Sequence, residues 1–116
     1  MSNKGPITTH VLDVSRGKPA TGIEVQLEVL EANQVWRKLG ESTTDADGRI
    51  LNLIAREGFA SGQYRLTFAT AAYFAAKNLS TFYPQVQIEF TVAATSEHYH
   101  VPLLLSPFGY STYRGS

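Results

Sequence analysis

The sequence contains no cysteine among its 116 residues. Disulfide bonds, thiol nucleophiles and thiolate-bound metals are therefore excluded. There is also no excess of charge of one sign, because ten basic and ten acidic side chains give a formal net charge of zero. No basic stripe or charge block is present for binding nucleic acid or a membrane surface, so we expect neither partner. A net charge near zero also offers little electrostatic resistance to self-association.

Long hydrophobic runs are missing as well. No stretch is apolar enough to span a bilayer, and residues 1–6 lack the hydrophobic segment of a signal peptide. We therefore expect a cytoplasmic protein whose residues 1–6 are flexible. The composition, with 43% hydrophobic and 17% charged residues, is that of a folded domain. Because no linker or internal repeat is visible, we predict a single domain over residues 1–116.

What the sequence does contain is an alternation of apolar and polar residues with a period of two. In Ile23–Val29 every second residue is apolar, and Gln85–Val92 repeats the pattern. Such alternation is typical of antiparallel strands that bury one face. Turn signals separate further segments that we predict to be strands: Ile7–Val14, Val35–Thr43, Arg49–Ile54, Tyr64–Phe68, Glu97–Leu105 and Gly109–Arg114.

One segment departs from this alternation. Thr70–Asn78 contains four alanines, which favours a short helix with Thr70 as its N-cap. About seven or eight short strands with a single helix predict an all-β fold in which two antiparallel sheets pack as a sandwich.

Three histidines are the candidate groups for chemistry. His10 lies in the first predicted strand, on the face shared with Thr8, and a lone histidine there is most often a partly buried structural residue. His98 and His100 lie two apart on a later strand, so both project from the same face. This spacing also suits zinc if a third ligand joins it, although no carboxylate spacing reinforces such a site. Arg49, after an Asp-Gly turn, would on its own be an ordinary solvated arginine.

Other reaction types have no support in the sequence. There is no nucleophile-elbow motif, no glycine-rich phosphate loop and no recognisable pair of catalytic carboxylates. What remains is histidine and arginine chemistry, which suits the addition of water to an activated carbonyl group.

Three motifs, in matching order, carry a family resemblance. They are THVLD at residues 9–13, TDADGR at 44–49 and EHYHVPLLLSPFGYSTYRGS at 97–116. The chain resembles the 5-hydroxyisourate hydrolases, or transthyretin-related proteins, from about Ile7 to Ser116. The resemblance implies a transthyretin-like sandwich and the hydrolysis of 5-hydroxyisourate, the first product of urate oxidation. It implies a reaction without metal or other cofactor.

The resemblance also assigns site residues. It places His10, Arg49, His100 and Ser116 in catalysis, and it gives substrate binding to His10, Arg49, Tyr113, Arg114 and Gly115. As a hypothesis, a neutral His10 or His100 takes a proton from water, Arg49 stabilises the developing oxyanion, and the tail positions the ring. Which histidine is the base stays open, and His98 receives no catalytic role.

An assembly follows from the same resemblance. It implies a homotetramer, a dimer of dimers joined at the sheet edges, with the sites between dimers and with Phe108, Tyr110 and Tyr113 as interface candidates. Two alternatives belong to other classes. One is a transthyretin-like carrier of a small ligand, a branch in which the site positions are replaced and the YRGS ending is missing. The other is a non-catalytic sandwich module, such as an adhesion or carbohydrate-binding domain, which leaves the polar face and tail unexplained.

Overall fold

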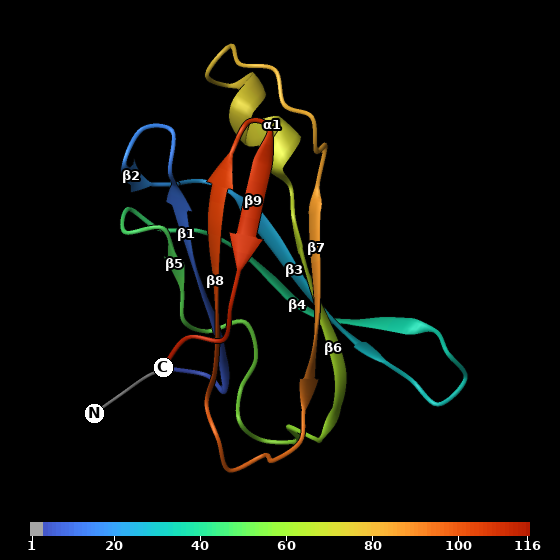
Figure 1. Cartoon of the computed structure of the whole chain (residues 1–116). Coiled ribbons are helices and arrows are strands. Elements are labelled where there is room, and N and C mark those ends of the chain that lie inside the picture. Colours follow the sequence, from blue (N-terminus) through green and yellow to red (C-terminus); the bar gives the residue numbers. More distant parts are fainter. Residues whose placement is uncertain (1–3) are drawn as a thin grey trace.

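Two β-sheets packed face to face form the protein, with one short helix at one end (Figure 1). The computed structural model describes residues 4–116. Sheet A contains β1 (Ile7–Asp13), β2 (Lys18–Pro19), β5 (Arg49–Ile50), β8 (Tyr99–Ser106) and β9 (Gly109–Thr112). Sheet B contains β3 (Glu24–Leu30), β4 (Trp36–Thr43), β6 (Gly62–Phe68) and β7 (Val86–Val92). The predicted all-β sandwich with one helix is confirmed.

The strand order explains how distant segments meet. Sheet A runs β2-β1-β8-β9, with β5 also paired to β1, and sheet B runs β4-β3-β6-β7. All of these pairs are antiparallel except β1 with β8, which run parallel in register from Ile7 opposite Tyr99 to Asp13 opposite Leu105. Alternation within a strand cannot reveal the direction of its neighbour, so this parallel pair was not predicted.

Two strands end earlier than predicted, and one short strand was not predicted. The strand expected over Arg49–Ile54 ends at Ile50, because the chain then turns to bury Leu53 in the core. The last strand ends at Thr112 rather than at Arg114. The strand β2 was missed, since its two residues lie in a segment rich in turn signals.

The helix α1 spans Thr70–Ala75, so the predicted helix is present but shorter. Thr70 is not its N-cap. Ala69 holds that position without a side-chain hydrogen bond, while the Thr70 hydroxyl is buried and donates to the Tyr83 carbonyl at 2.9 Å. Asn78 adopts a left-handed backbone conformation, with φ of 58°, beyond the end of the helix. This six-residue helix is too short to cross a membrane, and none of residues 4–116 forms a helix that could.

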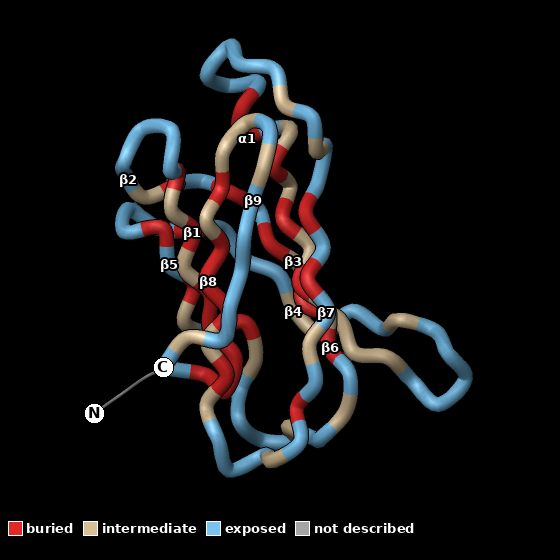
Figure 2. The backbone as a smooth tube through the Cα atoms, viewed as in Figure 1, coloured by how far each residue is buried: buried red, intermediate tan, exposed pale blue. Residues whose placement is uncertain are grey.

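The core lies between the two sheets (Figure 2). Sheet B contributes Leu27, Leu66 and Phe68, and sheet A contributes Val11 and Leu103, all of them fully buried. Because successive side chains on a strand point to opposite faces, Thr8 and His10 on β1 project to the outer face of sheet A. The outer face of sheet A is therefore where the predicted histidines must be sought.

The start of the described chain is packed against the sandwich. Gly5 and Pro6 are buried, the Gly5 amide donates to the Leu51 carbonyl at 2.7 Å, and the Tyr99 amide donates to the Pro6 carbonyl at 2.9 Å. These contacts place Gly5 and Pro6 in the packed domain rather than in the flexible segment that we predicted for residues 1–6. Residues 1–3 of that segment lie outside the described residues.

A buried carboxylate ties the end of β1 to the helix. Asp13 is 0% exposed and accepts hydrogen bonds from the Tyr73 hydroxyl at 2.7 Å, the Ser15 hydroxyl at 2.6 Å and the Arg16 amide at 3.3 Å. Burial raises the pKa of Asp13, but the hydrogen bonds from Ser15, Tyr73 and Arg16 outweigh burial and leave the pKa below its ordinary value. The ionised carboxylate therefore contributes stability to the fold above its unfolded pKa, and that contribution is lost as the pH falls through the folded pKa.

Substituting Tyr73→Phe tests this link. We expect the free energy of unfolding to fall by about 1–3 kcal/mol at neutral pH, because a buried carboxylate loses one of its donors. The difference from the wild type should shrink in acid, where Asp13 becomes protonated. Urea denaturation at pH 7 and at a series of pH values below 3.8, the ordinary pKa of this group, measures both effects. The control Tyr83→Phe keeps the ring contacts with Phe82 and Tyr110 and should change stability by less than about 0.5 kcal/mol. Equal stability of Tyr73→Phe and the wild type would contradict the account.

Candidate active site

His10 and Arg49 are neighbours across two paired strands. Their Cα atoms are partners in the antiparallel pair of β1 and β5. Ile50, the next residue, is buried in the core, so the Arg49 side chain projects to the outer face of sheet A, where it is exposed. The pairing places an imidazole and a guanidinium side by side on one face, as we predicted for these two residues.

The turn before β5 explains how Arg49 reaches this position. The Asp45 carboxylate accepts hydrogen bonds from the amides of Asp47 and Arg49, both at 2.9 Å, which closes an Asx turn. Gly48 has a positive φ of 74°, and a Cβ there would come within 2.4 Å of the Val11 carbonyl oxygen. A glycine is therefore required at this point, and the TDADGR motif forms a tight turn against β1.

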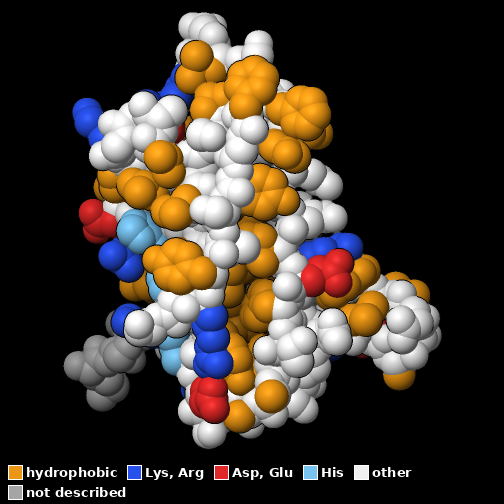
Figure 3. All heavy atoms as spheres, viewed as in Figure 1, with side chains coloured by type: hydrophobic (Ala, Val, Ile, Leu, Met, Phe, Trp, Pro, Cys, Tyr) orange, Lys and Arg blue, Asp and Glu red, His pale blue; other side chains and the backbone are white. Residues whose placement is uncertain are grey.

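His100 joins the same face through the parallel pair of β1 and β8. Its Cα is the partner of Thr8, two residues before His10 on β1. The Thr8 hydroxyl lies 2.7 Å from Nδ1 of His100 and 2.9 Å from Nε2 of His98. The two histidines do project from one face of their strand, as predicted. Figure 3 looks onto this side of the molecule and shows histidine side chains beside Lys and Arg side chains.

The electrostatic environment favours neutral imidazoles. The pKa of His100 is lowered by burial first, and then by the positive charges of Arg49 and Lys4 and by His10 and His98. The pKa of His98 is lowered by burial and by the charges of Lys4 and Arg56. Both rings are therefore neutral near pH 7, and a neutral imidazole with a free ring nitrogen can accept a proton.

The C-terminal tail covers one edge of His100. After β9 the chain returns over β8, where the Gly115 amide donates to the His100 carbonyl at 2.8 Å. A Cβ at residue 115 would lie 2.6 Å from Cδ2 of His100 and 3.1 Å from Cγ of Pro102. Only glycine allows so close an approach, and Ser116 follows it as an exposed residue beside the site.

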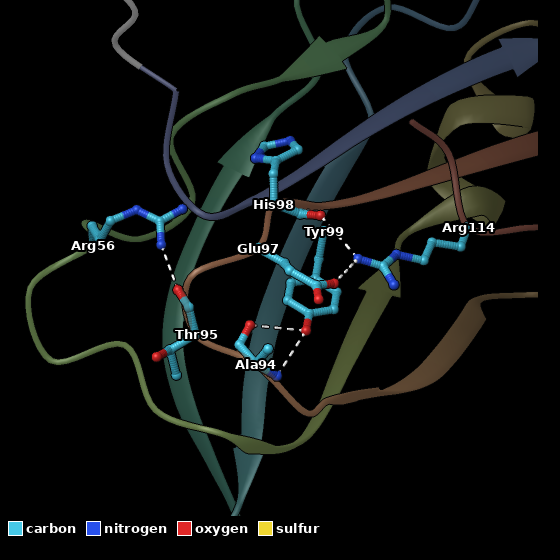
Figure 4. A network of polar contacts seen from close by, with 7 residues as sticks. All are labelled: Arg56, Ala94, Thr95, Glu97, His98, Tyr99 and Arg114. Carbon is cyan, nitrogen blue, oxygen red and sulfur yellow. Dashed lines mark hydrogen bonds and ion pairs between the residues drawn. The ribbon is translucent and has the colours of Figure 1, made fainter.

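The Arg114 side chain contacts groups other than the imidazole rings. Its guanidinium donates to the Glu97 carboxylate at 2.9 Å and to the His98 carbonyl at 3.2 Å, and it stacks on the Tyr99 ring at 4.5 Å (Figure 4). The figure shows the His98 ring on the opposite side of β8 from the Tyr99 ring. The structure therefore engages Arg114 with Glu97 and Tyr99, not with the imidazoles.

Tyr113 lies at the border of a cleft. It is 58% exposed and lines a cleft of about 210 Å³ between the tail and β7, together with Ile88, Phe90 and one edge of His100. The predicted tail residues thus divide into two groups. Gly115 lies against His100 and is followed by the exposed Ser116, whereas Tyr113 and Arg114 border the cleft.

The contact of Thr8 with His98 and His100 was not predicted from the sequence. The alternation placed Thr8 and His10 on one face, but nothing in it indicated that β8 lies parallel to β1 and presents His98 and His100 to the Thr8 hydroxyl. Within residues 4–116 no group of three or more His, Asp or Glu side chains is arranged to hold a metal ion. The His98–His100 pair, which the sequence left open as part of a zinc site, contacts Thr8.

The sequence and the backbone are similar to those of known proteins. The sequence profile of the HIUase/Transthyretin family matches residues 7–115. The 5-hydroxyisourate hydrolase of Salmonella dublin is 51% identical over 110 residues, which cover 95% of this chain and 80% of the relative. The structure of Klebsiella pneumoniae 5-hydroxyisourate hydrolase is similar with a TM-score of 0.85 and 38% identity, covering 97% of this chain and 99% of that one.

A transthyretin matches the backbone even better. Sea bream transthyretin in complex with thyroxine gives a TM-score of 0.91 at 32% identity, covering 95% of this chain and 94% of that chain. The backbone alone therefore does not separate a hydrolase from a hormone-bound protein, and the side chains of the site must do so. The profile match along nearly the whole sequence, together with these identities, shows that the chain belongs to the HIUase/Transthyretin family.

Proposed function

We propose that this protein is a 5-hydroxyisourate hydrolase, a cyclic amide hydrolase of urate breakdown whose product is 2-oxo-4-hydroxy-4-carboxy-5-ureidoimidazoline. The observation that carries the proposal is the convergence of His10, Arg49 and His100 on one face of sheet A. The names of the relatives in Salmonella dublin and Klebsiella pneumoniae support it. The reaction needs a base for water, a positive charge for the oxyanion and a surface for the ring, and this face offers all three.

Each group has a task in this proposal. A neutral His10 or His100 removes a proton from water as the water attacks the ring carbonyl. Arg49 holds the carbonyl oxygen with planar, permanently charged donors, so it stabilises the negative charge of the tetrahedral intermediate. Tyr113, Gly115 and Ser116 at the tail position the ring, and Arg114 binds it only if its side chain leaves Glu97 and Tyr99.

A decay assay separates the hydrolase from the carrier. Freshly generated 5-hydroxyisourate disappears spontaneously, and its ultraviolet absorbance reports the rate. We expect catalytic amounts of this protein to accelerate the decay, with saturation at high substrate. A protein that binds thyroxine and leaves the spontaneous rate unchanged would support the carrier reading, for which the similarity to sea bream transthyretin is the specific observation.

The site also suggests an assembly, which we propose to be a homotetramer with the sites between its dimers. Arg49 is exposed on a single chain, so bound substrate would face bulk water on one side. Large apolar side chains are exposed as well, with Phe108 70% and Tyr110 42% exposed. A second copy packed on this face would enclose the substrate. If light scattering found a monomer under conditions in which the protein is fully active, this assembly would be contradicted.

A cytoplasmic location stays a prediction.

Gly115→Ala tests the role of the tail. A methyl group at residue 115 would collide with the His100 ring, so the tail or the ring must shift. Because a displacement of about 1 Å at a site can lower activity by as much as 10²-fold, we expect kcat/KM for 5-hydroxyisourate to fall by about 10–100-fold. The control Gly109→Ala places its Cβ 3.8 Å from the nearest atom, Oγ of Ser106, and should keep nearly full activity. If both variants were equally active, the close contact of the tail with His100 would have no role.

A further inference from the structure

One hydroxyl group lies between two imidazoles. Oγ1 of Thr8 lies 2.7 Å from Nδ1 of His100 and 2.9 Å from Nε2 of His98. Thr8 is only 1% exposed, so little bulk water reaches this hydroxyl. Both distances are those of ordinary hydrogen bonds, and each requires one donor and one acceptor.

Proton counting couples the two rings. A hydroxyl carries a single proton, so Thr8 can donate to one neutral imidazole and must accept from the other. If Thr8 donates to Nε2 of His98, then His100 carries its proton on Nδ1, and its Nε2 is a bare lone pair. If Thr8 donates to Nδ1 of His100, then His100 carries its proton on Nε2. The tautomer of His100 is thus tied, through Thr8, to that of His98.

We propose that Thr8 is a positioning residue that connects His100 to His98, and that protons pass between the reaction and solvent along His100, Thr8 and His98. The inference rests on the proposed function, in which an imidazole activates water. It goes further because it selects His100 as the base and gives His98 a role. His98 suits the outer end of such a chain because its side chain is partly exposed, whereas Thr8 is buried.

The protons balance over one turnover. Nε2 of His100 takes a proton from water as the new C–O bond forms; its Nδ1 proton passes to Thr8, the Thr8 proton passes to Nε2 of His98, and Nδ1 of His98 releases one proton to solvent. As the C–N bond breaks, His100 gives its Nε2 proton to the ring nitrogen while Thr8 returns a proton to Nδ1 of His100, so the ring stays neutral and no imidazolate forms. The reverse transfer, starting with a solvent proton at Nδ1 of His98, restores both tautomers. One water molecule is consumed, and no proton is gained or lost.

The surrounding charges keep the imidazoles of His98 and His100 neutral. The side chains whose charges act on His100 are those of Arg49 on β5, His10 on β1, His98 just before β8 and Lys4 before β1, and none of them is an anion. Lys4 and Arg56 face His98. Burial and these charges lower the pKa of both imidazoles, so near pH 7 each ring has one proton, as the relay requires.

Two substitutions of Thr8 separate the hydroxyl from the packing. Thr8→Val keeps the shape and removes the hydroxyl, whereas Thr8→Ser removes a methyl group and keeps the hydroxyl. We expect Thr8→Val to lower kcat for 5-hydroxyisourate by about 10–100-fold, a part of the 10²–10⁴ that acid–base catalysis supplies, with KM changed by less than about twofold. Thr8→Ser should stay within about threefold of the wild type, because proton transfer depends on the hydroxyl and not on the methyl group.

A third variant tests His98. The amide of His98→Gln can still bond to Thr8 but cannot take up or release a proton near neutral pH, so kcat should fall by about as much as in Thr8→Val. Because Thr8 and His98 act in one proton relay, the double variant Thr8→Val with His98→Gln should be no slower than either single variant. Additive losses would overturn the relay.

Ring-nitrogen NMR gives a readout apart from activity. The ¹⁵N shifts of His100 distinguish a protonated Nδ1 from a bare one, and we expect Thr8→Val to change them while Thr8→Ser does not. Wild-type shifts and wild-type kcat in Thr8→Val would overturn the proposal, as would equal losses in Thr8→Val and Thr8→Ser. If the wild type failed to hydrolyse 5-hydroxyisourate, the proposed function would fail, but the shifts would still decide whether Thr8 couples the two rings.

Discussion

Replacing Arg49 with alanine is expected to lower kcat for 5-hydroxyisourate hydrolysis by about 10²–10³-fold, the loss typical of removing one oxyanion donor. The guanidinium is the permanent positive charge that β5 places beside His10 and near His100. A tetrahedral intermediate on this face would lose its principal counter-charge in the variant. Arg49→Lys should recover only part of the rate, because an ammonium group keeps the charge but not the planar pair of donors.

A matched arginine supplies the control for this experiment. Arg37 is also exposed, but it lies on β4 in sheet B, where it pairs with Glu31 at 2.8 Å. Arg37→Ala should leave kcat within about twofold of the wild type, since surface ion pairs contribute little. If Arg49→Ala were as active as Arg37→Ala, the oxyanion role of Arg49 would be wrong.

Arg49→Ala should also shift the pH dependence of what activity remains. A base works only when it is neutral, so activity falls as the pH drops through its pKa. Burial and then Arg49 lower the pKa of His100, which keeps the wild type active to lower pH than an ordinary histidine would. Removing Arg49 removes one of these causes, so the acid limb should move to higher pH.

Replacing His100 with asparagine is expected to lower kcat by about 10²–10⁴-fold, the usual contribution of a general acid–base group. His100 is the imidazole that Thr8 holds through Nδ1 and that the tail covers at Gly115, so its Nε2 is the nitrogen left for water. The asparagine amide can still form a hydrogen bond with Thr8 but cannot take up a proton. The rate at saturating substrate is the measurement that reports the chemical step.

His10→Asn is the comparison that assigns the base. His10 lies beside Arg49 and projects from the same face, so we expect it to position substrate and its loss mainly to raise KM. The opposite outcome, a large loss of kcat in His10→Asn and a mere change of KM in His100→Asn, would exchange the two roles and remove the basis of the Thr8 relay.

Local patterns in the sequence predicted local features of the site well. The spacing of His98 and His100 placed both rings on one face because the side-chain period of a strand is two. The Asp-Gly turn placed Arg49 at the start of a strand because Gly48 and the Asp45 carboxylate together define a tight turn. The family motifs in turn indicated that these separate segments converge, which periodicity alone does not reveal.

Features that depend on contacts between segments were not predicted. The parallel register of β1 and β8, which brings Thr8 to His98 and His100, leaves no trace in the alternation of either strand. The ion pair of Arg114 with Glu97, stacked on Tyr99, likewise depends on where the tail crosses β8. The helix start was misplaced because the Thr70 hydroxyl bonds to Tyr83, which lies beyond the helix, instead of capping it.

The crystal structure of this protein with uric acid bound would test the central claim most directly. Uric acid has the bicyclic skeleton of the proposed substrate but lacks its reactive centre. The account predicts that the ring lies on the outer face of sheet A, in contact with the Arg49 guanidinium and Nε2 of His100, next to Ser116. A ring bound instead in the cleft lined by Phe90 and Tyr113, away from the Arg49 guanidinium and from Nε2 of His100, would contradict it.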